Sequence, residues 1–294
     1  MQEAKSIVVG YDGSEEAEQA IRWAAEQASL RGCPLQVVHC SLWPLLTKNL
    51  GPVPGVADSG LEHAGQATLD EGVEHAKAAA PKADVRSTLV YGWPAVYLPK
   101  LSAGQEMLVV GSRGIGGFMG LVVGSVSLEM AATAACPVAV IRSDVHREGP
   151  VVVAIDTSGS RTALEDACTL ARVGKADLII VHVQHAPAGF RMLRDPAAAH
   201  PSSQALLDSA VSKARELAPE SNVEGQLLTD TSIPKAILKS AQNARITVVG
   251  TKGQGLIKGT FGSTAHAVLH HAKGPVLISR RRPSGQPDVP HGAP

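Results

Sequence analysis

One glycine-rich stretch, residues 107–126, combines the residue types that bind phosphate groups in proteins. It opens with an apolar run at 107–110, which predicts a buried strand, and it ends at Gly124 and Ser125 before a helical pattern. Glycines let the backbone approach a ligand closely, and successive N–H groups beside a helix N-terminus attract anions. The hydroxyl of Ser125 can either cap the helix or donate to a phosphate oxygen. The stretch therefore predicts a site for the phosphates of a nucleotide.

Two common phosphate-binding motifs do not fit this stretch. A P-loop requires a lysine after its last glycine, and none is present here. A dinucleotide fingerprint requires a third glycine where this chain has Met119. The spacing that remains is Gly111-x2-Gly114-x9-Gly124-Ser125.

Composition limits the class of protein. The 294 residues suit one large domain or two ordinary ones. Lys plus Arg and Asp plus Glu both number 27, which argues against nucleic acid or an anionic membrane surface as a partner. Aromatic residues make up only 3%, so an aliphatic core is expected. The four cysteines are scattered, which favours neither a disulfide framework nor a zinc site.

Membrane insertion is an alternative for one segment. Residues 117–141 carry a single formal charge, Glu129, but the small residues and Pro137 favour a loop, a helix and a strand instead. The chain enters its first apolar run almost at once, without a signal-peptide pattern. We therefore expect a cytoplasmic protein with no membrane span.

The chain contains an internal repeat. Five apolar runs recur in the same order, at an offset that drifts from 144 for Asp12 and Asp156 to 138 for Pro137 and Pro275. The matching pairs are 6–14 with 151–158, 35–39 with 178–182, 89–95 with 227–236, 108–111 with 247–250, and 136–142 with 274–280. We expect one domain at 1–146, a second at 147–284 and a disordered tail at 285–294.

In each copy the apolar runs alternate with helical patterns, which predicts a parallel sheet covered by helices on both faces. The proline-containing segments 43–61 and 187–201 are expected to be loops, possible lids over a site. If the strand order is 3-2-1-4-5, the ends of strands one and four meet, and Asp12 lies beside Gly111. Asp12 could then contact an adenosine or help to hold Mg²⁺; the alternative is a helix cap or turn residue.

The glycine spacing and the duplication together resemble the universal stress protein family in its tandem, ATP-binding branch. The resemblance covers nearly all of the chain except its tail. It implies two flavodoxin-like (HUP/Rossmann-like) α/β domains, each a five-stranded parallel sheet of order 3-2-1-4-5. It also implies ATP as ligand, with or without Mg²⁺, and no nucleic acid or membrane partner.

The resemblance further implies the site residues. The aspartate after strand one lies by the adenosine, the backbone after the strand-two histidine reads the adenine, and the loop holds ribose and phosphates. In the first copy these residues are Gly10, Asp12, Cys40, Gly111, Ser112, Arg113, Gly114, Gly116, Gly117, Gly124, Ser125, Val126 and Ser127. In the second copy they are Ala154, Asp156, Val183, Gly250, Thr251, Lys252, Gly253, Gly255, Gly262, Ser263 and Thr264.

The second copy departs from the pattern. Its last glycine interval is one residue shorter, Ala154 replaces Gly10, and Lys252 stands where the first copy has Arg113. We expect two sites, with the affinity of the second left open. His266 and His270 lie four apart on a predicted helix, but they lack the glutamate of a zinc-binding H-E-x-x-H motif.

The expected function is an ATP-binding regulatory module of the stress response, without robust catalysis. One alternative is a weak ATP hydrolase or nucleotidyl transferase, in which Arg113 stabilises charge and Asp12 positions water. Another is a dimeric interaction scaffold that binds no nucleotide. The apolar edge runs at 137–142 and 275–280 must be covered, and the resemblance implies that the two copies pack through them and that whole chains form homodimers.

Overall fold

A computed structural model describes residues 4–42, 59–114, 123–142, 146–186, 201–251 and 262–280. The first half contains β1 (Ile7–Gly10), α1 (Glu15–Arg31), β2 (Leu35–Ser41), α3 (Ser59–Ala79), β3 (Val85–Tyr91), α4 (Pro94–Leu101), β4 (Met107–Gly111), α5 (Ser125–Thr133) and β5 (Val138–Ile141). The second half contains β6 (Val151–Ile155), α6 (Arg161–Val173), β7 (Leu178–His185), α7 (Pro201–Leu217), β8 (Val223–Asp230), α8 (Ile233–Ser240), β9 (Ile246–Gly250), α9 (Ser263–His271) and β10 (Val276–Ser279).

The ten strands of the described residues form one sheet in the order β3-β2-β1-β4-β5-β10-β9-β6-β7-β8. Within each half all neighbouring strands are parallel, which confirms the predicted order 3-2-1-4-5 twice. At the centre β5 and β10 pair antiparallel, with Ala139 opposite Leu277. The last strand of each half is therefore covered by the other half, as predicted, within one chain.

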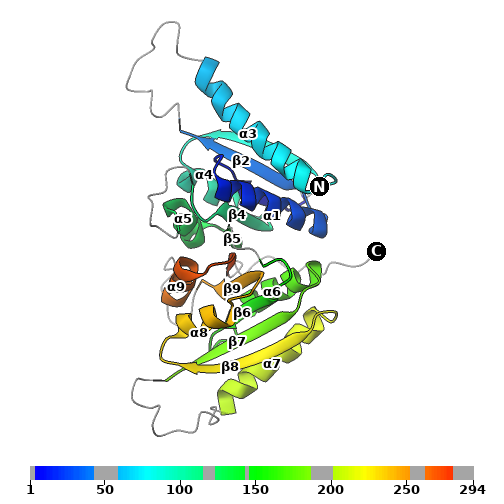
Figure 1. Ribbon diagram of the computed structural model, residues 1–294, viewed down its shortest axis with the longest axis vertical. Coiled ribbons are helices and arrows are strands. Elements are labelled where there is room, and N and C mark those ends of the chain that lie inside the picture. The colour runs from blue at the N-terminus through cyan, green and yellow to red at the C-terminus, as the bar shows by residue number, and fades with distance from the viewer. Residues whose placement is uncertain are drawn as a thin grey trace.

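Helices cover both faces of this sheet (Figure 1). One layer is α1, α3, α6 and α7, and the other is α4, α5, α8 and α9. Side chains alternate between faces along a strand, so Ala139 and Ile141 enter the first core and Val138 and Val140 the second. Each core includes residues from both halves, because the antiparallel seam keeps equivalent faces on the same side of the sheet.

The turns into the first helices differ between the halves. Ser14 caps α1 by accepting a hydrogen bond from the Ala17 N–H at 3.2 Å, and acidic side chains occupy the first turn. α1 begins three residues after Asp12, whereas α6 begins five residues after Asp156. In the longer turn, Ser160 takes a left-handed conformation with φ of 42°.

Two predicted loop boundaries were placed too late. α3 already begins at Ser59 and α7 at Pro201, where proline is tolerated because the first helical N–H has no partner within the helix. The rest of these segments, 43–58 and 187–200, lies outside the described residues. None of the described helices combines the length and apolar character needed to cross a membrane.

We predict that Leu277→Ala at the central seam lowers the free energy of unfolding by about 2–5 kcal/mol, because it leaves a cavity in a packed core. Leu277 is 1% exposed. Leu30→Ala is the matched control, because Leu30 is 56% exposed and its truncation should change stability by no more than about 0.5 kcal/mol. Denaturant unfolding measures both, and equal effects would contradict a buried seam.

Candidate functional site

The carboxyl ends of β1 and β4 bring Asp12 and Gly114 together. A methyl group added to Gly114 would lie 2.3 Å from Oδ2 of Asp12, so the carboxylate lies directly against the glycine loop. The two residues are about a hundred positions apart, and the strand order β1-β4 makes them neighbours. The convergence expected from the sequence is present.

Asp12 also holds its own turn. Its Oδ1 accepts hydrogen bonds from the Ser14 N–H at 3.1 Å and from the Ser14 hydroxyl at 2.6 Å. Between them Gly13 has a φ of 84°, a conformation that glycine adopts without strain. Asp12 is thus a turn residue, one of the two alternatives raised above, while its other oxygen faces the loop.

Backbone hydrogen bonds close the base of the glycine loop. The Ser112 N–H donates to the Ile141 carbonyl at 2.8 Å, and the Gly124 N–H donates to the Ser112 carbonyl at 2.7 Å. The buried Ser127 hydroxyl donates to the Gly111 carbonyl at 2.7 Å. Ser127 therefore supports the loop from beneath. The two ends of the loop are fixed side by side, next to the start of α5.

The N-terminus of α5 lies at the end of this loop. Gly124 is the N-cap residue, and no side chain caps the helix. Ser125 is the first helical residue and is exposed, while Val126 is half-buried. Of the two roles considered for the Ser125 hydroxyl, capping is therefore not observed. The helix presents its positive dipole end and an exposed hydroxyl beside the loop.

Arg113 joins the loop to α1. Its guanidinium forms an ion pair with Glu16 in the first turn of α1, including a 2.9 Å hydrogen bond from Nε. Gly111 lies at the same contact, because a methyl group there would be 2.8 Å from the backbone carbon of Glu16. The first turn of α1 therefore packs tightly against the end of β4.

The end of β2 carries backbone hydrogen-bonding groups on the side of β1 and Asp12. The Val38 carbonyl accepts from the Tyr11 N–H at 2.9 Å, on the β1 side of the strand. Backbone groups alternate sides along a strand, so Cys40 directs its N–H and carbonyl to that side, beyond the end of β1. Burial raises the pKa of the Cys40 thiol to about 11, so the thiol is protonated at neutral pH.

His39 is a supporting residue that sequence reasoning did not assign a role. Its Nδ1 is 2.8 Å from the Tyr11 carbonyl, just before Asp12. His182 makes the same contact with the Ile155 carbonyl at 3.0 Å in the second half. The recurrence of histidine at this position in both copies is the signal that could have found it.

The second half repeats the base of the loop. The Thr251 N–H donates to the Ser279 carbonyl at 3.0 Å, and the Gly262 N–H donates to the Thr251 carbonyl at 2.9 Å. Ser263 is the exposed first residue of α9, followed by the half-buried Thr264. These bonds match those of the first half, although this loop is one residue shorter.

Its aspartate is also held in a similar way. Asp156 Oδ1 accepts from the Ser158 N–H at 2.8 Å and from the Ser160 hydroxyl at 3.1 Å. Val183 is buried and lies two residues after Val181 on β7, the position that Cys40 has on β2.

Several supports of the first loop are missing from the second. Ala265 occupies the position of Ser127, and Thr162 that of Glu16. Among the described residues, no atom lies within 4 Å of where a methyl group on Gly250 would be, unlike at Gly111. Ala154 in place of Gly10 is tolerable, because a methyl group at Gly10 would approach Leu98 no closer than 3.4 Å. Five predicted site residues lie outside the described residues: Gly116, Gly117, Lys252, Gly253 and Gly255.

The helix α9 also carries the histidines considered above as metal ligands. His266 and His270 have ring centroids 4.5 Å apart on α9, and burial, followed by the neighbouring charges, lowers the pKa of His270. Within the described ranges, no group of three or more His, Cys, Asp and Glu side chains could hold a metal ion.

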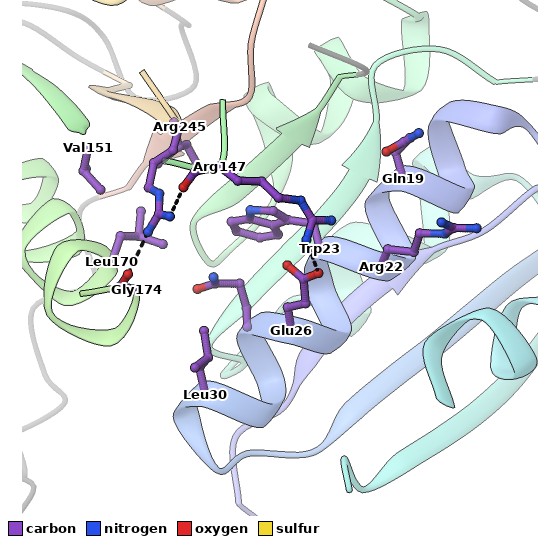
Figure 2. Close-up of a pocket in the computed structure, with 12 residues that line it drawn as sticks. Gln19, Arg22, Trp23, Glu26, Leu30, Arg147, Val151, Leu170, Gly174 and Arg245 are labelled. Atoms are coloured by element: carbon purple, nitrogen blue, oxygen red, sulfur yellow. Dashed lines mark hydrogen bonds and ion pairs between the residues drawn. The ribbon is translucent and has the colours of Figure 1, made fainter. Parts of the chain in front are cut away.

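A pocket of about 150 Å³ lies between the halves, at α1 and the segment that leads into β6 (Figure 2). There Arg147 pairs with Glu26 at 3.1 Å, and Arg245 donates to the Gly174 carbonyl at 2.8 Å and to the Arg147 carbonyl. These contacts attach the connecting segment to both halves.

We predict that Gly111→Ala lowers the free energy of unfolding by about 1–3 kcal/mol, because the methyl group would overlap the backbone of α1. Gly250→Ala is the matched control in the second half, where no described atom would contact the added methyl group. It should leave stability unchanged or raise it by up to about 1 kcal/mol. Denaturant unfolding of the two variants tests this, and equal losses would show that the loops are supported alike.

Comparison with known proteins agrees with this architecture. The model of the universal stress protein family matches residues 3–142 and again 149–280. Universal stress protein Rv2005c of Mycobacterium tuberculosis is 33% identical over 294 residues, covering 94% of this chain and 97% of the relative. The crystal structure of a universal stress protein from Archaeoglobus fulgidus covers 95% of this chain and 97% of its own, with 22% identity and a TM-score of 0.69. Another universal stress protein from Archaeoglobus fulgidus, solved in complex with dAMP, covers 45% of this chain and 97% of its own, with 26% identity and a TM-score of 0.36. The chain belongs to the universal stress protein family.

Proposed function

We propose that the protein binds ATP at the end of β1 and β4 and acts as a nucleotide-dependent regulatory module. The observation that carries this proposal is the contact of Asp12 with Gly114 beside the exposed start of α5. The carboxylate can accept a hydrogen bond from a sugar or a base, and the loop can bind phosphates. Both lie at the carboxyl ends of the same pair of parallel strands.

The nucleoside end is assigned to Asp12 and Cys40. The Cys40 backbone offers one donor and one acceptor beyond the end of β1, which suits the edge of an adenine ring. Oδ2 of Asp12 lies just beyond the end of β1, against Gly114 of the loop. A ribose hydroxyl or the adenine amino group would donate a hydrogen bond to it there.

The phosphate end is assigned to the loop and to α5. The dipole of α5 and the Ser125 hydroxyl favour an anion at this point. Mg²⁺ is commonly held by one or two carboxylates together with substrate phosphates, so Asp12 is the residue suited to a metal that enters with ATP.

The second half is proposed to bind ATP more weakly. Its loop keeps the two backbone hydrogen bonds at its base. Ala265 and Thr162 replace Ser127 and Glu16, so two side-chain contacts that support the first loop are lost at the described ends of the second. Fewer preformed contacts raise the conformational cost of binding.

A regulatory role without robust turnover is favoured over hydrolysis by the position of Arg113. Its guanidinium is paired with Glu16 and braces the loop, whereas an arginine that stabilises a transition state must point at the transferred phosphate. Arg113 is 46% exposed, so this ion pair contributes little to stability by itself.

We predict that calorimetric titration of the full chain with MgATP shows two unequal sites, and that Asp12→Ala weakens the tighter one about 10- to 100-fold. That range corresponds to losing a hydrogen bond to a charged group. Asp84→Ala is the control, because Asp84 is an exposed carboxylate paired with Arg86 at the start of β3. Absence of heat and of any co-purified nucleotide would favour the scaffold alternative, and steady phosphate release above about 1 per second would favour the hydrolase.

A homodimer is also proposed, and its interface must differ from the central seam. β5 and β10 pair with each other inside the chain, whereas β3 and β8 end the sheet and have one strand neighbour each within the described ranges. Light scattering should give twice the mass of one chain. A single-chain mass at all concentrations would contradict the dimer and leave the fold unaffected.

A further inference from the structure

Two arginines, at equivalent positions in the two halves, each donate a hydrogen bond to a helix of the other half. Arg142 directly follows β5, and its Nη2 donates to the Leu269 carbonyl in α9 of the second half. Arg280 directly follows β10, and its Nη2 donates to the Ala131 carbonyl in α5 of the first half. Figure 1 shows α5 and α9 on the same side of the central strands, where these contacts occur.

The helices that accept these bonds are those that begin at the two glycine loops. α5 starts after Gly124 and α9 after Gly262. Ala131 and Leu269 lie in the last turn of their helices, where carbonyls lack a partner within the helix. A cation at this end also complements the negative end of the helix dipole. Each arginine therefore caps a helix whose other end lies at a proposed phosphate site.

The two arginines differ in burial. Arg142 is 6% exposed, and burial, followed by the charge of Arg113, lowers its pKa to about 10. Arg280 is half-buried, and burial also lowers its pKa. A guanidinium group is protonated throughout the physiological pH range, so removing either one would leave a helix-end carbonyl without its charged donor.

Each arginine is also bonded covalently to a residue that closes the loop of its own half. Ile141 accepts the hydrogen bond from Ser112, and Ser279 accepts the one from Thr251. A short path of contacts therefore runs from each loop, through the end of the last strand, to the helix that begins at the other loop.

We propose that Arg280 positions the first nucleotide site and Arg142 positions the second, so that each site is completed from the opposite half. This inference rests on the proposed function. It implies that the two sites are energetically coupled, because ordering one loop also orders the arginine that holds the other site's helix.

The test uses full-length single-site chains, in which one site is weakened so that binding at the other can be followed. Asp156→Ala weakens the second site and leaves the first unchanged, and Asp12→Ala does the reverse. Adding Arg280→Met should weaken ATP binding about 10-fold in the Asp156→Ala chain and less than about 2-fold in the Asp12→Ala chain, with one lost charge-assisted hydrogen bond as the cause. Arg142→Met should act mainly in the Asp12→Ala chain. Arg280 is the cleaner variant, because Arg142 also lies near Arg113 of its own loop.

Arg147→Met is the control for general loosening of the two halves. Arg147 joins them through its ion pair with Glu26 on α1, on the face opposite α5 and α9. It should change neither affinity by more than about 2-fold. Equal losses in both single-site chains for Arg280→Met, or a larger loss at the second site, would overturn the crossed assignment.

A second measurement needs no nucleotide, so it separates this inference from the proposed function. In the free chain, amide hydrogen exchange over residues 125–133 should rise in Arg280→Met, while exchange over 263–271 stays near its original rate. Arg142→Met should give the reverse pattern. Exchange that rises equally in both helices, or in neither, would contradict the inference even if ATP binding is confirmed.

Discussion

The antiparallel pairing of β5 with β10 determines how the two halves are arranged. It joins two parallel five-stranded sheets into one and covers the apolar last strand of each half. Because the pairing is antiparallel, the carboxyl ends of the strands point in opposite directions in the two halves. The two glycine loops therefore lie at opposite ends of the strands, whereas equivalent helices lie on the same face of the sheet.

The sequence alone predicts the alternation of strands and helices and the duplication, because both follow from features that are local or repeated: apolar runs bounded by glycine, and a repeat that shows every run twice. The strand order, and with it the meeting of Asp12 with the glycine loop, is implied by the resemblance to the universal stress protein family. In a parallel sheet of order 3-2-1-4-5, strands one and four are neighbours, so their carboxyl ends bring Asp12 and Gly114 together. Seam pairing followed from the need to cover two apolar edges.

Side-chain partners could not be derived in the same way. Arg113 was considered as a group that stabilises charge, yet it pairs with Glu16, 97 positions away. Arg280 contacts a carbonyl 149 positions away, in the other half. Such contacts depend on where whole helices settle, and no local pattern encodes that. The contrast between Gly111 and Gly250 has the same origin, because within the described residues a helix backbone approaches the first glycine closely and the second not at all.

Duplication has kept the base of each loop and changed its surroundings. The two backbone bonds at that base recur almost unchanged, whereas the supporting hydroxyl and ion pair are found only in the first half of the described structure. Hydrogen bonds between backbone groups survive substitution because they need no particular side chain. Side-chain supports are free to diverge, and such divergence would make the two proposed sites unequal.

A crystal structure of the full chain with ATP and magnesium would locate the nucleotide. We predict a purine at the Cys40 backbone, a ribose at Asp12 and phosphates between the loop and the start of α5. Nucleotide bound elsewhere, such as in the pocket beside Trp23 and Arg147, or no nucleotide at saturating concentration, would contradict it.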